Sequence, residues 1–120
     1  MPGPILIVDD DDVTRDTLSV LFRGAGYAVV TAANGQQALS YLRTPPAPAL
    51  VLLDLLMPVA DGWQFLGERR KDAALAAVPV VVLSGGDKRL RSAALLMGAD
   101  EFFEKPMDPE DLLTVVGRYV

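Results

Sequence analysis

The stretch Leu50-Val51-Leu52-Leu53-Asp54 is a short apolar run that ends directly at a carboxylate. Continuous apolar runs of this length are typical of strands that are buried on both faces of a parallel sheet. Residues 5–8 and 78–83 share the pattern and are bounded by Asp, Pro or Gly. Residues 28–31 and 101–103 are weaker strand candidates, which suits the edges of a sheet. The sequence therefore predicts five strands.

Helical patterns separate these strands, with apolar residues that recur at i, i+3, i+4 and i+7. The helical segments lie around residues 18–25, 38–42, 61–66, 90–97 and 109–116. The last one has the clearest start, because Asp108 is a good N-cap and Pro109 suits the first helical position. Strand and helix alternate five times, which predicts an α/β fold with a doubly wound, five-stranded parallel sheet and five helices.

The composition is that of an ordinary globular domain, and we expect residues 1–120 to form one. Sixteen acidic against eleven basic residues argue against direct binding to nucleic acid or to anionic membranes. The chain has no cysteine and no apolar stretch near the roughly 20 residues of a membrane span, so we expect a cytoplasmic protein. It also lacks histidine, which removes the usual general base and the usual phosphoryl donor.

Polar side chains that could take part in catalysis or bind a metal ion follow the predicted strands. Asp9 and Asp10 come after the first strand, Asp54 ends the third, Ser84 ends the fourth, and Lys105 follows the fifth. We expect them to meet, because ligands in such sheets bind beyond the carboxyl ends of the strands. Crowded carboxylates raise each other's pKa values unless a cation lies among them. The sequence therefore predicts a Mg²⁺ site, since Mg²⁺ prefers a few carboxylates together with water.

Each of these residues also has an ordinary structural interpretation. A run of aspartates is often a solvated helix start, and we interpret Asp11 and Asp12 in that way. The two aspartates before them lie closer to the strand end, which favours the metal interpretation there. Ser84 alone would be typical of a turn, and Lys105 alone of a surface charge. Their joint placement at strand ends is what predicts a site.

Taken in order along nearly the whole chain, several motifs resemble the receiver domain of two-component response regulators, the CheY-like family. They lie at residues 5–11 with Arg15, at 26–27, 34–35 and 38–39, at 52–58 with 61–62, and at 79–84, 98–99 and 102–106. The resemblance implies a flavodoxin-like sheet with the strand order 2-1-3-4-5.

The resemblance also implies the chemistry of the site. Asp54 would be the phosphoryl acceptor. Asp9, Asp10 and Asp54 would hold Mg²⁺, together with the backbone carbonyl of Leu56. The phosphoryl group would come from a sensor histidine kinase, a histidine phosphotransfer protein or a small acyl phosphate, and the modified domain would bind a downstream effector protein. Such a domain catalyses only its own phosphorylation and dephosphorylation.

Three further roles are implied in the same way. Ser84 would be the switch hydroxyl, Lys105 would contact the phosphoryl group, and Phe102 would be the rotating aromatic residue of the partner-binding face. The Lys105-Pro106 peptide bond would be cis, which would aim Lys105 into the site.

Other classes of protein fit less well. An aspartate-nucleophile phosphatase of the haloacid dehalogenase type needs a second Asp two residues after the nucleophile, where this chain has Leu56. A flavodoxin needs a Ser, Thr or Gly loop after the first strand to hold phosphate, and four aspartates there would repel it. A receiver fold without phosphotransfer stays a third alternative, which the complete set of site residues argues against. Whether the domain stands alone or is excised, and whether it dimerises, is left open.

Overall fold

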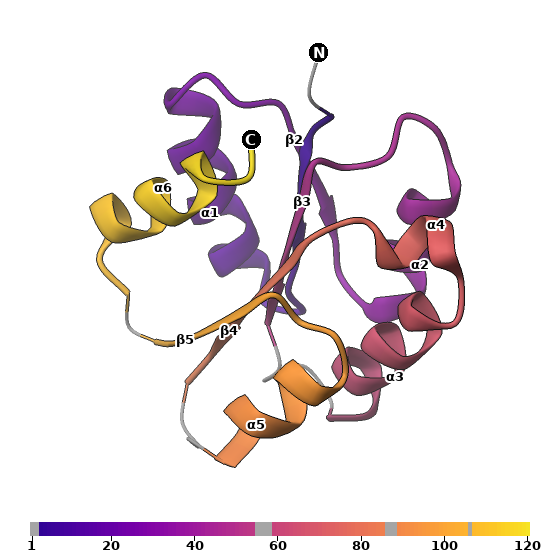
Figure 1. Cartoon of the computed structure of the whole chain (residues 1–120). Coiled ribbons are helices and arrows are strands. Elements are labelled where there is room, and N and C mark those ends of the chain that lie inside the picture. The colour runs from indigo at the N-terminus through magenta and orange to yellow at the C-terminus, as the bar shows by residue number, and fades with distance from the viewer. Residues whose placement is uncertain (1–2, 55–58, 86–88, 106) are drawn as a thin grey trace.

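The computed structural model describes residues 3–54, 59–85, 89–105 and 107–120. Within them, five strands form one parallel sheet in the order β2-β1-β3-β4-β5 (Figure 1). The strands are β1 (Ile5–Val8), β2 (Val29–Ala32), β3 (Leu50–Asp54), β4 (Val80–Ser84) and β5 (Glu101–Glu104). The predicted strand order is confirmed, and the two weaker candidates are the two edge strands, β2 and β5.

Helices cover both faces of the sheet (Figure 1). They are α1 (Asp12–Gly24), α2 (Gly35–Arg43), α3 (Val59–Arg70), α4 (Ala73–Ala76), α5 (Arg89–Leu96) and α6 (Pro109–Gly117). Buried residues of α1 and α6 pack in one hydrophobic cluster, and buried residues of α2, α3, α4 and α5 pack in a second one. The predicted doubly wound architecture is confirmed.

The central strands are buried on both faces because their side chains point alternately to the two clusters. In β3, Leu50 and Leu52 belong to the cluster beneath α1 and α6. Val51 and Leu53 belong to the cluster beneath the other four helices. Every position of the strand therefore needs an apolar side chain, which explains the unbroken run in the sequence until Asp54.

The described residues contain six helices, whereas the sequence pattern predicted five. The additional helix, α4, has only four residues, and the side chain of Asp72 caps it by accepting from the N–H of Ala74 at 3.0 Å. A single turn is too short to show helical periodicity in the sequence. The predicted N-cap of the last helix is confirmed, since Asp108 accepts from the N–H of Glu110 at 2.9 Å.

None of the helices in the described ranges combines the length and the apolar composition that a membrane span requires.

Candidate functional site

Strand register places the first two predicted site segments side by side. Val8, the last residue of β1, pairs with Leu53 of β3. Asp9 and Asp54 are therefore the next residues along two neighbouring parallel strands. Both are buried, with exposed fractions of 2% and 7%. Two carboxylates are thus held out of water at the carboxyl edge of the sheet.

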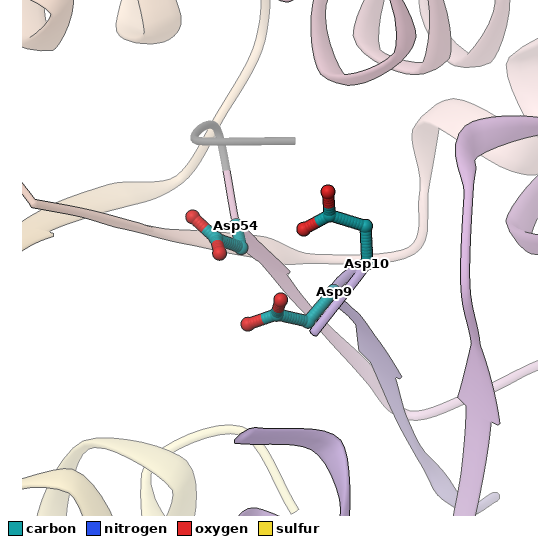
Figure 2. Close-up of side chains that lie close together, drawn as sticks. All are labelled: Asp9, Asp10 and Asp54. Carbon is teal, nitrogen blue, oxygen red and sulfur yellow. The ribbon is translucent and has the colours of Figure 1, made fainter. Parts of the chain in front are cut away.

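Asp10 completes a cluster of three carboxylates with Asp9 and Asp54. Each of the three offers an oxygen, and these oxygens all lie within 4.8 Å of one another. Figure 2 shows the three carboxylates around a common space at the ends of the two strands. Asp10 is exposed, so the cluster is open to solvent on one side. This is the donor set and the access that a hydrated Mg²⁺ ion needs.

Lys105 supplies the positive charge of the cluster. Its Nζ lies 3.1 Å from Oδ2 of Asp54 and 3.6 Å from Oδ2 of Asp9. Its position is fixed by the backbone, because the N–H of Lys105 donates to the carbonyl of Ser84 at 2.8 Å. The structure therefore brings the ammonium group that follows β5 to the carboxylates at the ends of β1 and β3, with the backbone of Ser84 next to that of Lys105.

Burial and crowding shift the titration of Asp9. Its pKa is raised from 3.8 to about 6, mainly by burial and further by the neighbouring Asp54. The N–H of Asp11, which donates to Oδ1 at 2.9 Å, and the charge of Lys105 oppose the rise. Asp9 is thus a carboxylate whose charge is poorly compensated, as expected for a cation ligand.

We expect Asp9→Asn to stabilise the folded protein at neutral pH in the presence of EDTA. A carboxyl group whose pKa is higher in the folded state binds more protons there, so stability falls as pH rises from about 4 to about 6. The variant should gain on the order of 1–3 kcal/mol at pH 7–8, and the gain should vanish below pH ~4. Denaturant unfolding at several pH values measures it.

Asp16→Asn is the matched control, because Asp16 is an exposed aspartate of α1 outside the cluster. It should change stability little at any pH. A gain of similar size in both variants, or a gain for Asp9→Asn that persists at pH 3, would contradict the account of Asp9.

The two later aspartates of the run have the predicted structural role. Asp11 is the N-terminal flanking residue of α1, and its carboxylate accepts from the hydroxyl of Thr14 at 2.6 Å. That hydrogen bond is the main reason why the pKa of Asp11 is lowered. Asp12 lies in the first turn and forms an ion pair with Arg15. Neither belongs to the carboxylate cluster.

Arg15 has a further contact that the sequence did not predict. Its Nη1 donates to the backbone carbonyl of Asp9 at 2.6 Å. The contact holds the strand end next to the first turn of α1. The only signal in the sequence is an arginine one turn into a helix that directly follows the acidic run, which is too common to predict it.

Ser84 is fully buried, and its Oγ is the one buried side-chain polar atom in the described residues that lacks a hydrogen-bond partner. Buried hydroxyl groups are nearly always paired, since an unpaired one costs free energy. The end of β4 thus holds a buried hydroxyl group whose hydrogen-bonding capacity is unused.

Phe102 lies in the middle of β5 with its side chain buried in the cluster beneath α2, α3, α4 and α5. It also lines a surface cavity of about 370 Å³ together with Arg91, Phe103 and Glu104. Its rotation stays a prediction. The backbone carbonyl of Leu56 and the geometry of the bond to Pro106 lie outside the described residues.

Comparison with known proteins agrees with this geometry. The family model of the response regulator receiver domain matches residues 5–117. Response regulator Rre1 of Synechocystis sp. is 38% identical over 117 residues, which are 96% of this chain and 50% of that protein. The probable transcriptional regulator ycf27 of Guillardia theta is 38% identical over 90% of this chain and 41% of its own length. The chain thus spans half or less of these two relatives.

Solved structures give the same result. A putative response regulator from Chloroflexus aurantiacus superposes with a TM-score of 0.89 at 32% identity, covering 99% of this chain and 98% of that one. The receiver domain of a histidine kinase from Syntrophus aciditrophicus has a TM-score of 0.86 at 31% identity. The match covers 98% of this chain and 89% of that one. Fold, sequence and the acidic strand ends agree, and the chain belongs to the receiver domain family of response regulators, the proteins of two-component signalling.

Proposed function

We propose that Asp54 accepts a phosphoryl group from a histidine kinase or a histidine phosphotransfer protein. One observation supports the proposal above all others. The buried Asp54 carboxylate lies at a strand end, 3.1 Å from the ammonium group of Lys105 and within 4.8 Å of two further carboxylates. A nucleophile, a fixed cation and a donor set for a metal ion thus share one small space.

The chemistry is an in-line displacement. An oxygen of Asp54 attacks the phosphorus of the donor, the bond from phosphorus to the donor nitrogen breaks, and the nitrogen leaves with the electron pair. With a small acyl phosphate, the bond from phosphorus to the acyl oxygen breaks instead. Charge spreads over the equatorial phosphoryl oxygens, so positioning and electrostatic stabilisation carry most of the catalysis. Lys105, whose Nζ lies 3.1 Å from Oδ2 of Asp54, would stabilise that charge.

Asp9, Asp10 and Asp54 would hold Mg²⁺ through their carboxylates. The backbone carbonyl of Leu56 would be the fourth ligand from the protein. The raised pKa of Asp9 supports this, because it marks a carboxylate whose negative charge is short of compensation. When bound, Mg²⁺ neutralises phosphoryl oxygens and the carboxylate cluster together.

Ser84 would report the modification by donating its unpartnered hydroxyl to the phosphoryl group. A charge-assisted hydrogen bond contributes about 1.5–3 kcal/mol, which is roughly a 10- to 150-fold change in population. Moving a two-state equilibrium from 1:99 to 99:1 needs about 5.5 kcal/mol. Lys105 and a bound effector would supply the difference, so the free phosphorylated domain would populate both states.

The output would pass through the face that carries Phe102 and its cavity. An effector protein binding there is the proposed partner. The relatives of about twice the length include regulators of transcription by name, so the effector is either a further domain or a separate protein. Residues 1–120 would form one receiver domain in both cases, and catalysis would be limited to its own phosphorylation and dephosphorylation.

Incubation with acetyl phosphate tests the proposal. We expect the wild-type protein to gain one phosphoryl group in the presence of Mg²⁺ and none in the presence of EDTA, as measured by intact mass spectrometry. Dependence on the metal follows from three carboxylates that would otherwise repel the phosphoryl oxygens. Equal labelling with and without Mg²⁺ would show that the metal ion is not needed for phosphorylation.

A further inference from the structure

Outside the carboxylate cluster, a second charged side chain, Arg69 in the last turn of α3, is buried in the protein. Its exposed fraction is 3%, and it takes no part in the proposed phosphoryl site. Burying a guanidinium group costs several kcal/mol unless its donors are paired. The nearest partner in charge is Asp100, whose Oδ2 lies 3.7 Å from Nη2 and which is partly exposed to solvent. Most of the compensation must therefore come from elsewhere.

Backbone carbonyls compensate the charge of Arg69. They come from two segments of the chain, one at residues 76–78 and one at residue 98. Nε and Nη2 donate to the carbonyl of Val78 at 3.1 and 2.6 Å, and Nη2 also donates to that of Ala76 at 3.1 Å. Nη1 donates to the carbonyl of Gly98 at 3.1 Å. The planar fork of arginine fits several acceptors at once, which lysine does not. One side chain thus ties α3 to the link between α4 and β4 and to the turn between α5 and β5.

The turn at Gly98 is built to receive this contact. Gly98 has φ of 100°, and the N–H of Ala99 donates back to the carbonyl of Ala94, which closes the end of α5. A Cβ atom at Gly98 would lie 3.3 Å from Nη1 of Arg69. The carbonyl groups at the end of α5 carry the negative end of the helix dipole, so a cation is favourable there.

A second arginine supports the same end of α5. Nη1 of Arg70 lies 3.4 Å from the carbonyl oxygen of Leu96 and 3.7 Å from the sulfur of Met97. Arg70 is exposed, so this tie is weaker than that of Arg69. In Figure 1, α3, α4 and α5 lie on the same side of the sheet, where these contacts connect them.

The start of β5 is also fixed. The carboxylate of Asp100 accepts from the N–H of Val80 at 2.7 Å, and the N–H of Asp100 donates to the carbonyl of Val80 at 2.8 Å. On the other face of the sheet, the hydroxyl of Tyr119 donates to Oε2 of Glu101 at 2.7 Å. Nη2 of Arg118 lies 3.3 Å from Oε1 of the same carboxylate. The turn between α5 and β5 is therefore held from both layers.

We propose that Arg69 makes the turn at residues 98–100 a fixed pivot for α5, so that the response to phosphorylation is confined to the other end of the helix. That other end follows β4, whose last residue is Ser84. The pivot itself is a property of the unmodified protein, and only the response rests on the proposed function.

Amide hydrogen exchange of the unmodified protein tests the pivot. In the wild type, the amides of residues 97–100 should exchange as slowly as those of β4. In Arg69→Met, they should exchange at least tenfold faster, measured relative to the change at the amides of α1. In the matched control Arg70→Met, the acceleration should be several-fold smaller.

Fast exchange of these amides in the wild type would overturn the proposal, and so would equal effects of the two variants or an acceleration that is uniform along the chain. Arg69→Lys serves if Arg69→Met does not fold, because it keeps the charge and loses the fork. If neither variant folds, the wild-type measurement still tests whether the turn is fixed, because fast exchange there would overturn the proposal.

The response is tested after treatment with acetyl phosphate and Mg²⁺. In the phosphorylated wild type, changes in exchange within α5 should be confined to residues 89–93, and in phosphorylated Arg69→Met or Arg69→Lys they should extend to residue 100. Changes along the whole of α5 in the wild type would contradict the pivot. If the wild type gains no phosphoryl group, the proposed function fails, and the pivot is judged by the unmodified protein alone.

Discussion

Asp54→Asn should gain no phosphoryl group from acetyl phosphate and Mg²⁺ under conditions in which the wild type is labelled. An amide nitrogen or oxygen is a poor nucleophile toward phosphorus, and no other buried carboxylate in the described residues has an ammonium group as close as 3.1 Å. The variant should stay folded, because it removes one of two buried carboxylates that repel each other. Intact mass spectrometry and circular dichroism measure both.

Asp12→Asn is the matched control for this variant. Asp12 lies three residues beyond Asp9 in the same acidic run, is exposed, and pairs with Arg15 outside the carboxylate cluster. It should be labelled like the wild type. Labelling of Asp54→Asn at the wild-type rate would show that the acceptor lies elsewhere.

Lys105→Met should have two effects of opposite sign. Labelling by acetyl phosphate should slow by roughly 10- to 150-fold, because a charge-assisted hydrogen bond of about 1.5–3 kcal/mol to the transferring group is lost. Mg²⁺ should bind more tightly, because the ammonium group within 3.6 Å of Asp9 and Asp54 no longer competes with it. Rates of labelling and a Mg²⁺ titration measure the two effects.

Lys105→Arg separates charge from shape. It keeps the positive charge near the carboxylates, so Mg²⁺ should bind much as in the wild type, while the longer planar group should recover only part of the labelling rate. If Lys105→Met weakened Mg²⁺ binding and left the rate unchanged, Lys105 would be a structural residue and the account of the site would be wrong.

Much of the fold and the site follows from the sequence for one physical reason. Buried parallel strands read as apolar runs, and the residue that ends each run must lie at the common edge of the sheet. Asp54 and Ser84 are the last residues of β3 and β4, and Asp9 directly follows β1. Predicting that they lie close together needed no knowledge of side-chain packing, and in the structure the carboxylates of Asp9 and Asp54 belong to one cluster.

Features that depend on packing were not predictable in the same way. Arg69 stands in the run Arg69-Arg70-Lys71, which is typical of an exposed basic helix end, yet its acceptors lie up to 29 residues away in sequence. The backbone carbonyls that compensate its charge have no signature in the sequence. The missing hydrogen-bond partner of Ser84 likewise depends on the neighbouring segments, because a serine at the end of a strand has the same sequence pattern whether or not its hydroxyl group is paired.

Chemical trapping of the modified residue tests the central proposal most directly. The wild-type protein is treated with acetyl phosphate and Mg²⁺, then reduced with borohydride, which converts an aspartyl phosphate to homoserine and leaves free carboxylates unchanged. Peptide mapping by mass spectrometry then locates the homoserine. We expect it at position 54 and at neither Asp9 nor Asp10. Homoserine at either of those two positions, or a phosphoryl group on a hydroxyl side chain that borohydride leaves in place, would contradict the assignment of Asp54 as the phosphoryl acceptor.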